Sequence, residues 1–264
     1  RVIDNRTSLL LADGDGSEAA ASAFAEQAGR AWGQRLAMFT DLVAPPSGTL
    51  EVLDASGQRL AEADGAVSLD VEGDAGFAVS RVEPAAGYAA HGCEDRTYRG
   101  RLYATVDASG RLAAVEALAL EELLRGLVPS EMPSGVAPEA LKAQAVTARS
   151  NVLAQIGTRH LTDPYVLCAE VHCQAYRGEA AQVPATDAAV RGTAGEALFG
   201  RRDRSLVDAV YHAMCGGHGE DNEAVWGNIP DPNLRGKPDL PAAEAAAWKG
   251  GLADEGRLAS FLAD

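Results

Sequence analysis

Glu131 is the carboxylate in this sequence whose neighbours best suit acid–base chemistry. It lies between Pro129 and Pro133 and directly before Met132. A carboxyl group in a partly apolar pocket has a raised pKa, which suits a general acid near neutral pH. The two prolines would keep the loop that carries it rigid. The competing interpretation is a surface glutamate that interacts favourably with the dipole of the helix that follows.

Two basic residues follow on a helix that we predict over residues 138–156. Lys142 and Arg149 are seven residues apart, so they share one face of that helix. Such a face could lower the pKa of the nearby carboxylate, or it could bind an anionic or carbonyl-rich substrate. The alternative is an ordinary solvated helix face. The apolar stripe opposite it consists of Leu141, Ala145, Ala148 and Val152.

Thiols and imidazoles are concentrated shortly after that helix. Cys168 precedes the pair His172-Cys173, and His160 lies upstream. Two thiols and two imidazoles could form a tetrahedral zinc site. A disulfide is the rival interpretation, because an even number of cysteines in an exported chain favours oxidation. The four cysteines, which allow three pairings, are Cys93, Cys168, Cys173 and Cys215.

A glycine-rich polar segment covers residues 211–220. Glycines allow the backbone to approach a ligand closely, so we treat this segment as a candidate binding loop. It lacks the G-x-x-x-x-G-K-[ST] pattern of a P-loop. It also lacks the P-C-x-x-C that follows H-x-E in zinc deaminases.

The elements that must position these residues indicate an α+β protein. Alternating apolar runs between turn residues predict short strands at 49–54, 58–63, 66–71, 77–82, 98–106, 112–118 and 206–211. Apolar residues at helical spacing predict helices at 17–37, 120–127 and 138–156. We expect Ser17 to cap the first helix and Pro138 to begin the last. We expect Pro129 to end the second, because proline cannot continue the backbone hydrogen bonds.

Residues 84–92 have the composition of a linker, which predicts a domain boundary near residue 90. We therefore expect a region of one helix and short strands over residues 1–90, whose role the sequence does not indicate. A mixed catalytic domain with short helices and antiparallel strands is expected over residues 91–264. Turns are expected at Asp107–Gly110 and at Gly216-Gly217.

Composition excludes several classes of protein. The 264 residues include 38 acidic and 23 basic side chains, for a net charge of −15, and 47% are apolar. That apolar content excludes wholesale disorder, and the negative charge disfavours binding to nucleic acid or to an anionic membrane. No apolar run is long enough for a transmembrane helix. The chain begins at Arg1 without a signal-peptide pattern, so we expect any secretory signal to have been removed or never included.

Several of these segments occur together in one order. They are Tyr98-Arg99-Gly100, LEELLRGLVPSEMP, PEALKAQAVTARS, CQAYRG and YHAMCGGHGEDNEAVWG. In order and wording they resemble the SpoIID/LytB family, the stage II sporulation protein D and amidase-enhancer proteins of bacterial cell-wall metabolism. The resemblance covers about residues 96–240 and does not extend to residues 1–90.

The resemblance implies a lytic transglycosylase of the cell envelope. Such enzymes cleave between N-acetylmuramic acid and N-acetylglucosamine in peptidoglycan glycan strands and leave 1,6-anhydro ends. The family's catalytic glutamate corresponds to Glu131, and its important arginine corresponds to Arg149. Candidate substrate-binding residues are Lys142, Gln144, Tyr211, His212, Gly216 and Gly217. Some members bind zinc, which would implicate Cys168, His172 and Cys173, with His160 as the fourth ligand.

One carboxylate is sufficient for this chemistry. Ordinary glycosidases need two, because one protonates the leaving oxygen and the other activates water or attacks the sugar. In a lytic transglycosylase the substrate's own 6-hydroxyl attacks, so Glu131 alone would serve as acid and then as base. Arg149 would orient Glu131 or hydrogen-bond to the substrate. The rival function is a non-enzymatic wall-binding module that enhances a separate amidase.

The sequence departs from the family pattern in one respect. Members usually carry a late GHGVGxxQ-G segment, which this chain does not contain. We therefore expect the catalytic domain to be incomplete at its C-terminal end.

Overall fold

The computed structural model describes residues 17–33, 36, 48–70, 75–84, 91–107, 109–160, 163–226, 230–239, 241, 256 and 259. Contacts divide the chain into two compact units. The first comprises Arg1–Ala12 with Phe39–Val210, and the second comprises Asp13–Met38 with Tyr211–Asp264. Helices occur together with antiparallel strands, which confirms the predicted α+β class.

The strands of the first unit form three small antiparallel sheets. They are β1 (Thr49–Leu53), β2 (Arg59–Asp64), β3 (Ala66–Leu69), β4 (Phe77–Val82), β5 (Glu94–Tyr98), β6 (Arg101–Val106) and β7 (Leu112–Ala117). β1 pairs with β2, β4 pairs with β5, and the third sheet has the order β3-β6-β7. The predicted division near residue 90 runs between β4 and β5, two strands that pair with each other.

The hairpins β1–β2 and β6–β7 turn on the same D-A-S-G sequence. Asp54 accepts hydrogen bonds from the backbone N–H groups of Ser56 and Gln58, at 2.8 and 2.9 Å. Asp107 accepts equivalent bonds from Ser109 and Arg111. This capping by an aspartate side chain is a general mechanism of turn formation, and it confirms the turn predicted to end at Gly110.

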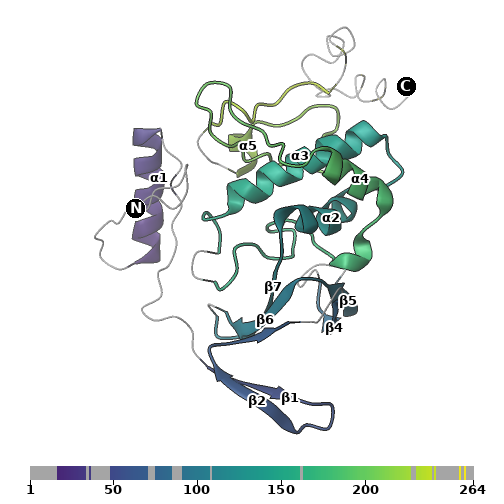
Figure 1. Ribbon diagram of the computed structural model, residues 1–264. Coiled ribbons are helices and arrows are strands. Elements are labelled where there is room, and N and C mark those ends of the chain that lie inside the picture. The colour runs from purple at the N-terminus through teal and green to yellow at the C-terminus, as the bar shows by residue number, and fades with distance from the viewer. Residues whose placement is uncertain are drawn as a thin grey trace. The chain divides into compact units, whose positions relative to one another are not determined.

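Three helices of the first unit pack against one another (Figure 1). They are α2 (Leu120–Glu131), α3 (Pro138–Gln155) and α4 (Pro184–Gly192), and a 3₁₀ turn at Glu179–Ala181 precedes α4. Pro138 begins α3, as predicted. The predicted apolar stripe of α3 is buried, and most of it joins the core. That core consists of Leu124, Leu127, Val128, Ala145, Ala148, Val152, Tyr176 and Val190.

The prediction that Pro129 ends the second helix was wrong. α2 continues through Pro129 for two further residues, so Glu131 is its last residue rather than part of a loop. Ser130 Oγ donates to the carbonyl of Gly126 at 2.8 Å, and Met132 N–H donates to the carbonyl of Val128 at 3.0 Å. These bonds keep the final turn helical around the one N–H group that proline lacks.

The predicted strand at 206–211 was also wrong. Only a single bridge forms there, between Leu206 and Phe199. Val207 N–H donates to the carbonyl of Leu198, and no longer ladder follows among the residues that the structure describes. Val207 and Ala209 are buried nonetheless. The apolar alternation therefore reflects burial of an irregular segment, which needs no neighbouring strand.

The second unit contains α1 (Glu18–Trp32) and α5 (Asn222–Trp226). Ser17 caps α1, as predicted, because its side chain accepts a bond from Ala20 N–H. α1 ends at Trp32 rather than near residue 37, and Gly33 follows with a φ of 61°. Gly216 and Gly217 form the predicted turn, with φ values of 62° and 92°. Among the described residues, no helix combines the length and apolar character needed to cross a membrane.

Candidate active site and metal centre

Glu131 is an exposed side chain at the C-terminal end of α2. Its Oε1 accepts a hydrogen bond from the backbone N–H of Ala175, at 3.0 Å. The prediction that this carboxylate lies in a partly apolar pocket is therefore wrong. The helix ends here, so the carboxylate projects from the last turn beside the segment 173–178.

That segment is closely packed on both sides of Ala175. Tyr176 is buried in the core, and its carbonyl accepts a bond from Arg96 Nη1 at 2.9 Å. Gly126 of α2 faces the Tyr176 ring so closely that a Cβ there would lie 2.5 Å from Cε2. Only glycine permits this approach of α2 to the segment.

A cavity of about 320 Å³ lies next to the same segment. This volume is at the lower end of the range for small-molecule sites. Its walls come from β5, the end of α2, the segment 173–178 and the 3₁₀ turn. The lining residues are Glu94, Asp95, Arg96, Pro129, Arg177, Ala180 and Ala181. Charged groups of both signs with small apolar side chains suit a neutral polar ligand such as a sugar.

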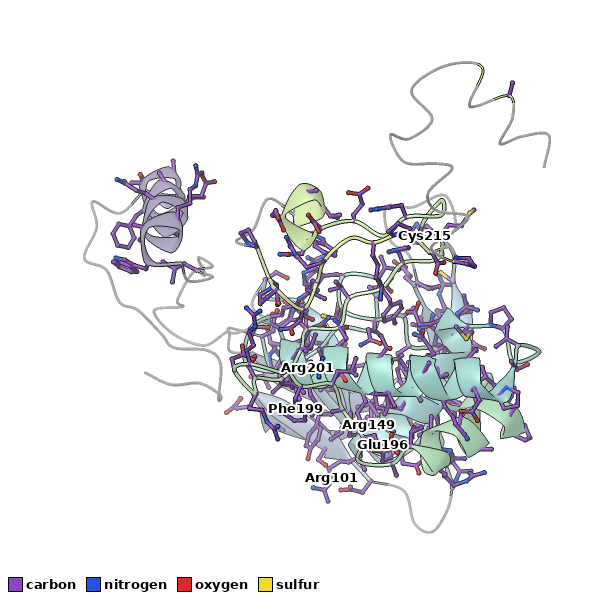
Figure 2. The ribbon with its side chains drawn as sticks, turned by 90° about the horizontal axis from the view of Figure 1, so that it is seen from above. Arg101, Arg149, Glu196, Phe199, Arg201 and Cys215 are labelled. Atoms are coloured by element: carbon purple, nitrogen blue, oxygen red, sulfur yellow. The ribbon has the colours of Figure 1, made fainter. Side chains whose placement is uncertain are left out.

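Arg149 and Lys142 lie seven residues apart on the continuous helix α3, as predicted, but at Arg149 that face is buried inside the protein rather than solvated. The side chain of Arg149 is 1% exposed. Nε and Nη2 donate to the two carboxylate oxygens of Glu121, at 2.9 and 2.8 Å. Nη1 donates to the carbonyl of Glu196 at 3.0 Å, and Figure 2 shows Arg149 beside Glu196. These bonds join α2, α3 and the turn after α4.

Among the described residues, no hydrogen bond or ion pair joins Arg149 to Glu131, although the sequence led us to expect that Arg149 could orient it. Glu121 lies in the first turn of α2 and Glu131 is its last residue. Ten residues of helix separate them, which is about 15 Å along the axis. Hydrogen bonding by Arg149 holds the pKa of the Glu121 carboxyl below its ordinary value. The guanidinium therefore acts at the opposite end of α2 from Glu131.

The other predicted substrate-binding residues fall into two groups. In the first unit, Lys142 Nζ pairs with Glu139 at 2.7 Å, and the buried Nε2 of Gln144 has no hydrogen-bond partner among the described residues. In the second unit lie Tyr211, His212, Gly216 and Gly217, of which His212 and Gly216 are exposed.

The four predicted metal ligands lie together. His160 Nε2 is 3.4 Å from Cys173 Sγ, and His172 Nδ1 is 3.6 and 3.7 Å from the sulfurs of Cys173 and Cys168. One ligand atom from each of the four residues lies within 4.8 Å of every other. All four cysteines are free thiols, so the disulfide alternative is not observed. This His/Cys cluster could hold a metal ion.

The surroundings of His160 also suit a metal ligand. Its Nδ1 lies 2.9 Å from a carboxylate oxygen of Asp163, and its Nε2 faces the cluster. A carboxylate on the second ring nitrogen is the usual way to orient a metal-binding histidine. His160 has a φ of 50°, an uncommon conformation for a residue other than glycine. Hydrogen bonding to Cys173 lowers the pKa of the Cys168 thiol below its ordinary value.

A buried polar network links α3 to the segment 173–178, and sequence reasoning missed it. Gln174 Nε2 donates to the carbonyl of Ala148 at 3.2 Å and to Asn151 Oδ1 at 2.7 Å. Gln155 Nε2 also donates to Asn151 Oδ1, and Asn151 Nδ2 donates to Asp208. The signal was present in the sequence, since Asn151 and Gln155 follow Ala148 at helical spacing.

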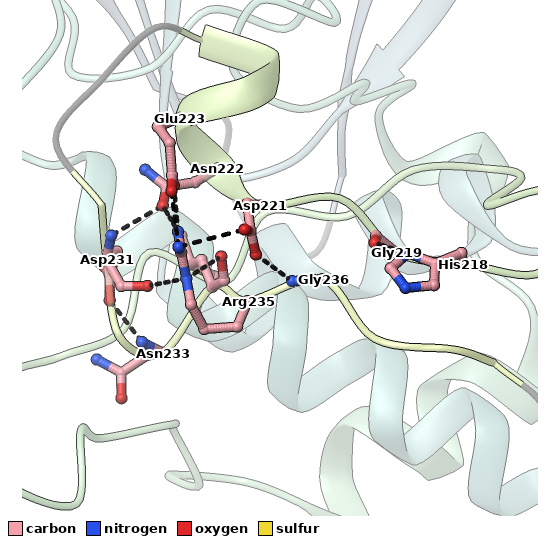
Figure 3. Close-up of polar contacts among 10 residues, drawn as sticks. His218, Gly219, Asp221, Asn222, Glu223, Asp231, Asn233, Arg235 and Gly236 are labelled. Atoms are coloured by element: carbon pink, nitrogen blue, oxygen red, sulfur yellow. Dashed lines mark hydrogen bonds and ion pairs between the residues drawn. The ribbon is translucent and has the colours of Figure 1, made fainter. Parts of the chain in front are cut away.

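Arg235 organises the described part of the loop over residues 221–236 of the second unit, which sequence reasoning also missed (Figure 3). It pairs with Glu223 and donates to Asn222 Oδ1 at 2.5 Å. Gly236 N–H donates to Asp221 at 2.6 Å. Hydrogen bonding by Arg235 lowers the pKa of Glu223 to about 2. The acidic residues of this segment are therefore engaged in holding the loop around α5.

Comparison with known proteins finds a family match over the part of the chain that contains this site. Residues 108–199 match the family model of SpoIID, described as Stage II sporulation protein. This match shows that residues 108–199 are similar to the SpoIID family. The resemblance seen in the sequence is thereby confirmed. The matched residues include Glu131, Arg149 and the whole His/Cys cluster.

Three curated proteins are similar to this chain. The amidase enhancer of Bacillus subtilis (strain 168) is 34% identical over 116 residues, which are 44% of this chain and 15% of that protein. The stage II sporulation protein D of the same organism is 32% identical over 127 residues, which are 43% of this chain and 36% of that protein. An uncharacterized protein of Brachyspira hyodysenteriae is 30% identical over 47% of this chain and 33% of its own length. The chain thus spans only about a third or less of the length of these three relatives.

Proposed function

We propose that this protein is a peptidoglycan lytic transglycosylase of the bacterial cell envelope, with Glu131 as its acid and base. The observation that carries the proposal is the position of Glu131. Its carboxylate is exposed at the end of a packed helix, and one oxygen is held by Ala175 N–H. The similarity to stage II sporulation protein D supports a role in cell-wall metabolism.

The reaction needs one proton carrier. Protonated Glu131 gives its proton to the oxygen that links C1 of N-acetylmuramic acid to the next sugar, and the C1–O bond breaks. The carboxylate then takes the proton of the 6-hydroxyl as that oxygen forms a bond to C1. The 1,6-anhydro ring closes, no water is consumed, and Glu131 is protonated again.

One contact of Glu131 bears on these two roles. The backbone N–H of Ala175 donates a hydrogen bond to Oε1, and this bond fixes the orientation of the carboxyl group. We propose that Oε2 carries the proton. The cavity is lined by Pro129, two residues before Glu131, and by Arg177, and we propose that its polar groups contact a neighbouring sugar ring; Glu131 itself does not line it.

We propose zinc as the metal of the His/Cys cluster. Two thiols and two imidazoles within 4.8 Å of one another are a donor set that zinc prefers, and Asp163 supplies the outer contact to His160. Four protein ligands would leave no open position, so the role of such a metal is to stabilise the segment 160–173. The steps above use only the residues of the chain.

Product analysis tests the proposed reaction. Glycan strands stripped of peptides are incubated with the protein, and the new ends are identified by mass spectrometry. We expect 1,6-anhydromuramyl ends, lighter by one water than the ends produced by hydrolysis. Reducing muramic acid ends would indicate a hydrolase instead, and the absence of any new ends would contradict the proposal.

Enhancement of a separate cell-wall amidase is the second candidate function. The similarity to a protein named amidase enhancer favours it. In that case the exposed end of α2 would contact a wall component or the amidase, and Glu131 would carry no proton. Stimulation of a wall amidase that persists in Glu131→Gln, without anhydro products from the unchanged protein, would favour this function.

A further inference from the structure

We propose that Gln174 is the positioning residue of Glu131. The inference rests on the proposed function for its catalytic consequence, but the geometry that it explains is independent of that function. Glu131 is exposed, and its described hydrogen bond comes from the backbone N–H of Ala175. Whatever fixes the peptide group between Gln174 and Ala175 therefore fixes the carboxylate.

Gln174 is the side chain that anchors this peptide group. It is 6% exposed and donates two hydrogen bonds to α3, one to the carbonyl of Ala148 and one to Asn151 Oδ1. The nitrogen of the Gln174–Ala175 peptide is the same N–H that donates to Glu131. Rotation of that peptide would break the bond to Glu131. The side chain of Gln174, which is bonded to α3, restrains this rotation.

The residue after Ala175 is held by different elements. Tyr176 N–H donates to the carbonyl of Ala169 at 3.3 Å, and the Tyr176 carbonyl accepts from Arg96 of β5. The two sides of Ala175 are thus fixed to α3 and to β5, while Glu131 approaches from α2. The last turn of a helix frays easily, so a fixed partner outside the helix is what keeps this carboxylate in one orientation.

Gln174 also follows directly after Cys173, a member of the His/Cys cluster. The cluster fixes one end of the segment, and the anchor in α3 fixes the peptide next to it. Two buried amide side chains, Gln155 and Gln174, share Asn151 Oδ1 as an acceptor, but only Gln174 belongs to the segment that contacts Glu131. This difference provides a matched control.

The test compares Gln174→Met with Gln155→Met in the full chain. Met has the length of Gln but donates no hydrogen bond. Hydrogen exchange of the Ala175 amide, measured by NMR, is expected to accelerate about tenfold or more in Gln174→Met and to stay unchanged in Gln155→Met. With glycan strands, we expect kcat to fall at least about tenfold in Gln174→Met while KM changes less than about twofold.

A second variant covers the case in which Gln174→Met does not fold. Asn151→Ala removes one of the two acceptors of Gln174 and should give the same exchange pattern at Ala175 to a smaller extent. A folded Gln174→Met with unchanged exchange at Ala175 overturns the inference. An equal loss of kcat in Gln174→Met and Gln155→Met also overturns the inference, because equal losses indicate a general loss of packing. If the unchanged protein cleaves no glycan, the proposed function fails, but the exchange data still decide the positioning role.

Discussion

Arg149 binds both carboxylate oxygens of Glu121, at 2.9 and 2.8 Å, and so joins the middle of α3 to the first turn of α2. Val190 and Glu196 contribute carbonyl acceptors to the same guanidinium. The family resemblance implied that this arginine orients Glu131 or hydrogen-bonds to the substrate, whereas the structure places its side chain in the interior. Its described contacts give it the role of holding the helix that carries Glu131.

Replacement of Arg149 should therefore reduce stability. In Arg149→Met, the Glu121 carboxylate and the carbonyl of Glu196 lose the hydrogen bonds from the guanidinium, and we expect the free energy of unfolding to fall by about 2–4 kcal/mol. Urea denaturation measures this. The control is Arg191→Met, whose exposed side chain lies 3.8 Å from Asp187, with an expected effect below about 0.5 kcal/mol. Unchanged stability with lost cleavage would instead place the Arg149 guanidinium at the substrate.

The same ion pair predicts a pH dependence. The folded protein has a lowered Glu121 pKa, caused first by hydrogen bonding to Arg149. Its stabilising contribution is thus present above the ordinary glutamate pKa of about 4.3 and is lost as pH falls through the lowered value. We expect the stability difference between the unchanged protein and Arg149→Met to shrink at about pH 3 relative to about pH 7. Denaturation curves at both pH values measure it, and a difference that does not change with pH would contradict this assignment.

Zinc binding is expected to require the His/Cys cluster. We predict one zinc per chain, with two Zn–S distances near about 2.3 Å and two Zn–N distances near about 2.0 Å in X-ray absorption spectra. Cys173→Ser should lose the metal, and Asp163→Asn should bind it about 10–100-fold more weakly, because Asp163 orients His160.

Cys93→Ser serves as the control for the metal site, since Cys93 is an exposed thiol outside the cluster. It should keep the full zinc content. Zinc content that is equal in Cys93→Ser and Cys173→Ser would show that the metal is held elsewhere.

The close approach of α2 to Tyr176 predicts that replacing Gly126 with alanine destabilises the protein. In Gly126→Ala the new methyl group would lie 2.5 Å from Tyr176 Cε2 and 2.8 Å from the carbonyl of Gly178. We expect a loss of about 1–3 kcal/mol of stability, because backbone and ring must move apart. The same movement displaces the residue next to Ala175 and should slow cleavage.

Gly192→Ala is the matched control for that substitution. Gly192 is also helical, but its added Cβ would lie 3.8 Å from Lys142 Cε, an ordinary contact. Alanine should be neutral or slightly stabilising there. Similar losses in both variants would show that the contact with Tyr176 is not the cause. Thermal unfolding compares the two.

Local patterns predicted much of the fold. The spacing of Leu141, Ala145, Ala148 and Val152 correctly placed the buried face of α3, because a regular helix repeats its faces whatever its neighbours are. The turn residues likewise predicted the β6–β7 hairpin. Pro129 misled because the lost hydrogen bond and the clash of its ring with the preceding turn disfavour a helix locally, whereas α2 continues through it with Leu127 and Val128 buried in the core.

The site was predicted in part. The clustering of His160, Cys168, His172 and Cys173 followed from residue types that share one chemistry. The partner of Arg149 could not be predicted, because Glu121 lies 28 residues away and only the packing of α2 on α3 brings them together. The hydrogen bond from Ala175 to Glu131 could not be predicted either, because its donor is a backbone N–H group, which nearly every residue type carries.

The central claim is that Glu131 carries the proton during cleavage of glycan strands. The most direct measurement compares the rate at which anhydromuramyl ends appear with the unchanged protein, with Glu131→Gln and with Glu139→Gln. Glu139 is an exposed glutamate in the first turn of α3 that pairs with Lys142, so its replacement controls for loss of a surface charge. We predict a fall of about 10²–10⁴-fold in Glu131→Gln and less than about twofold in Glu139→Gln. Cleavage by Glu131→Gln at the rate of the unchanged protein would contradict the account.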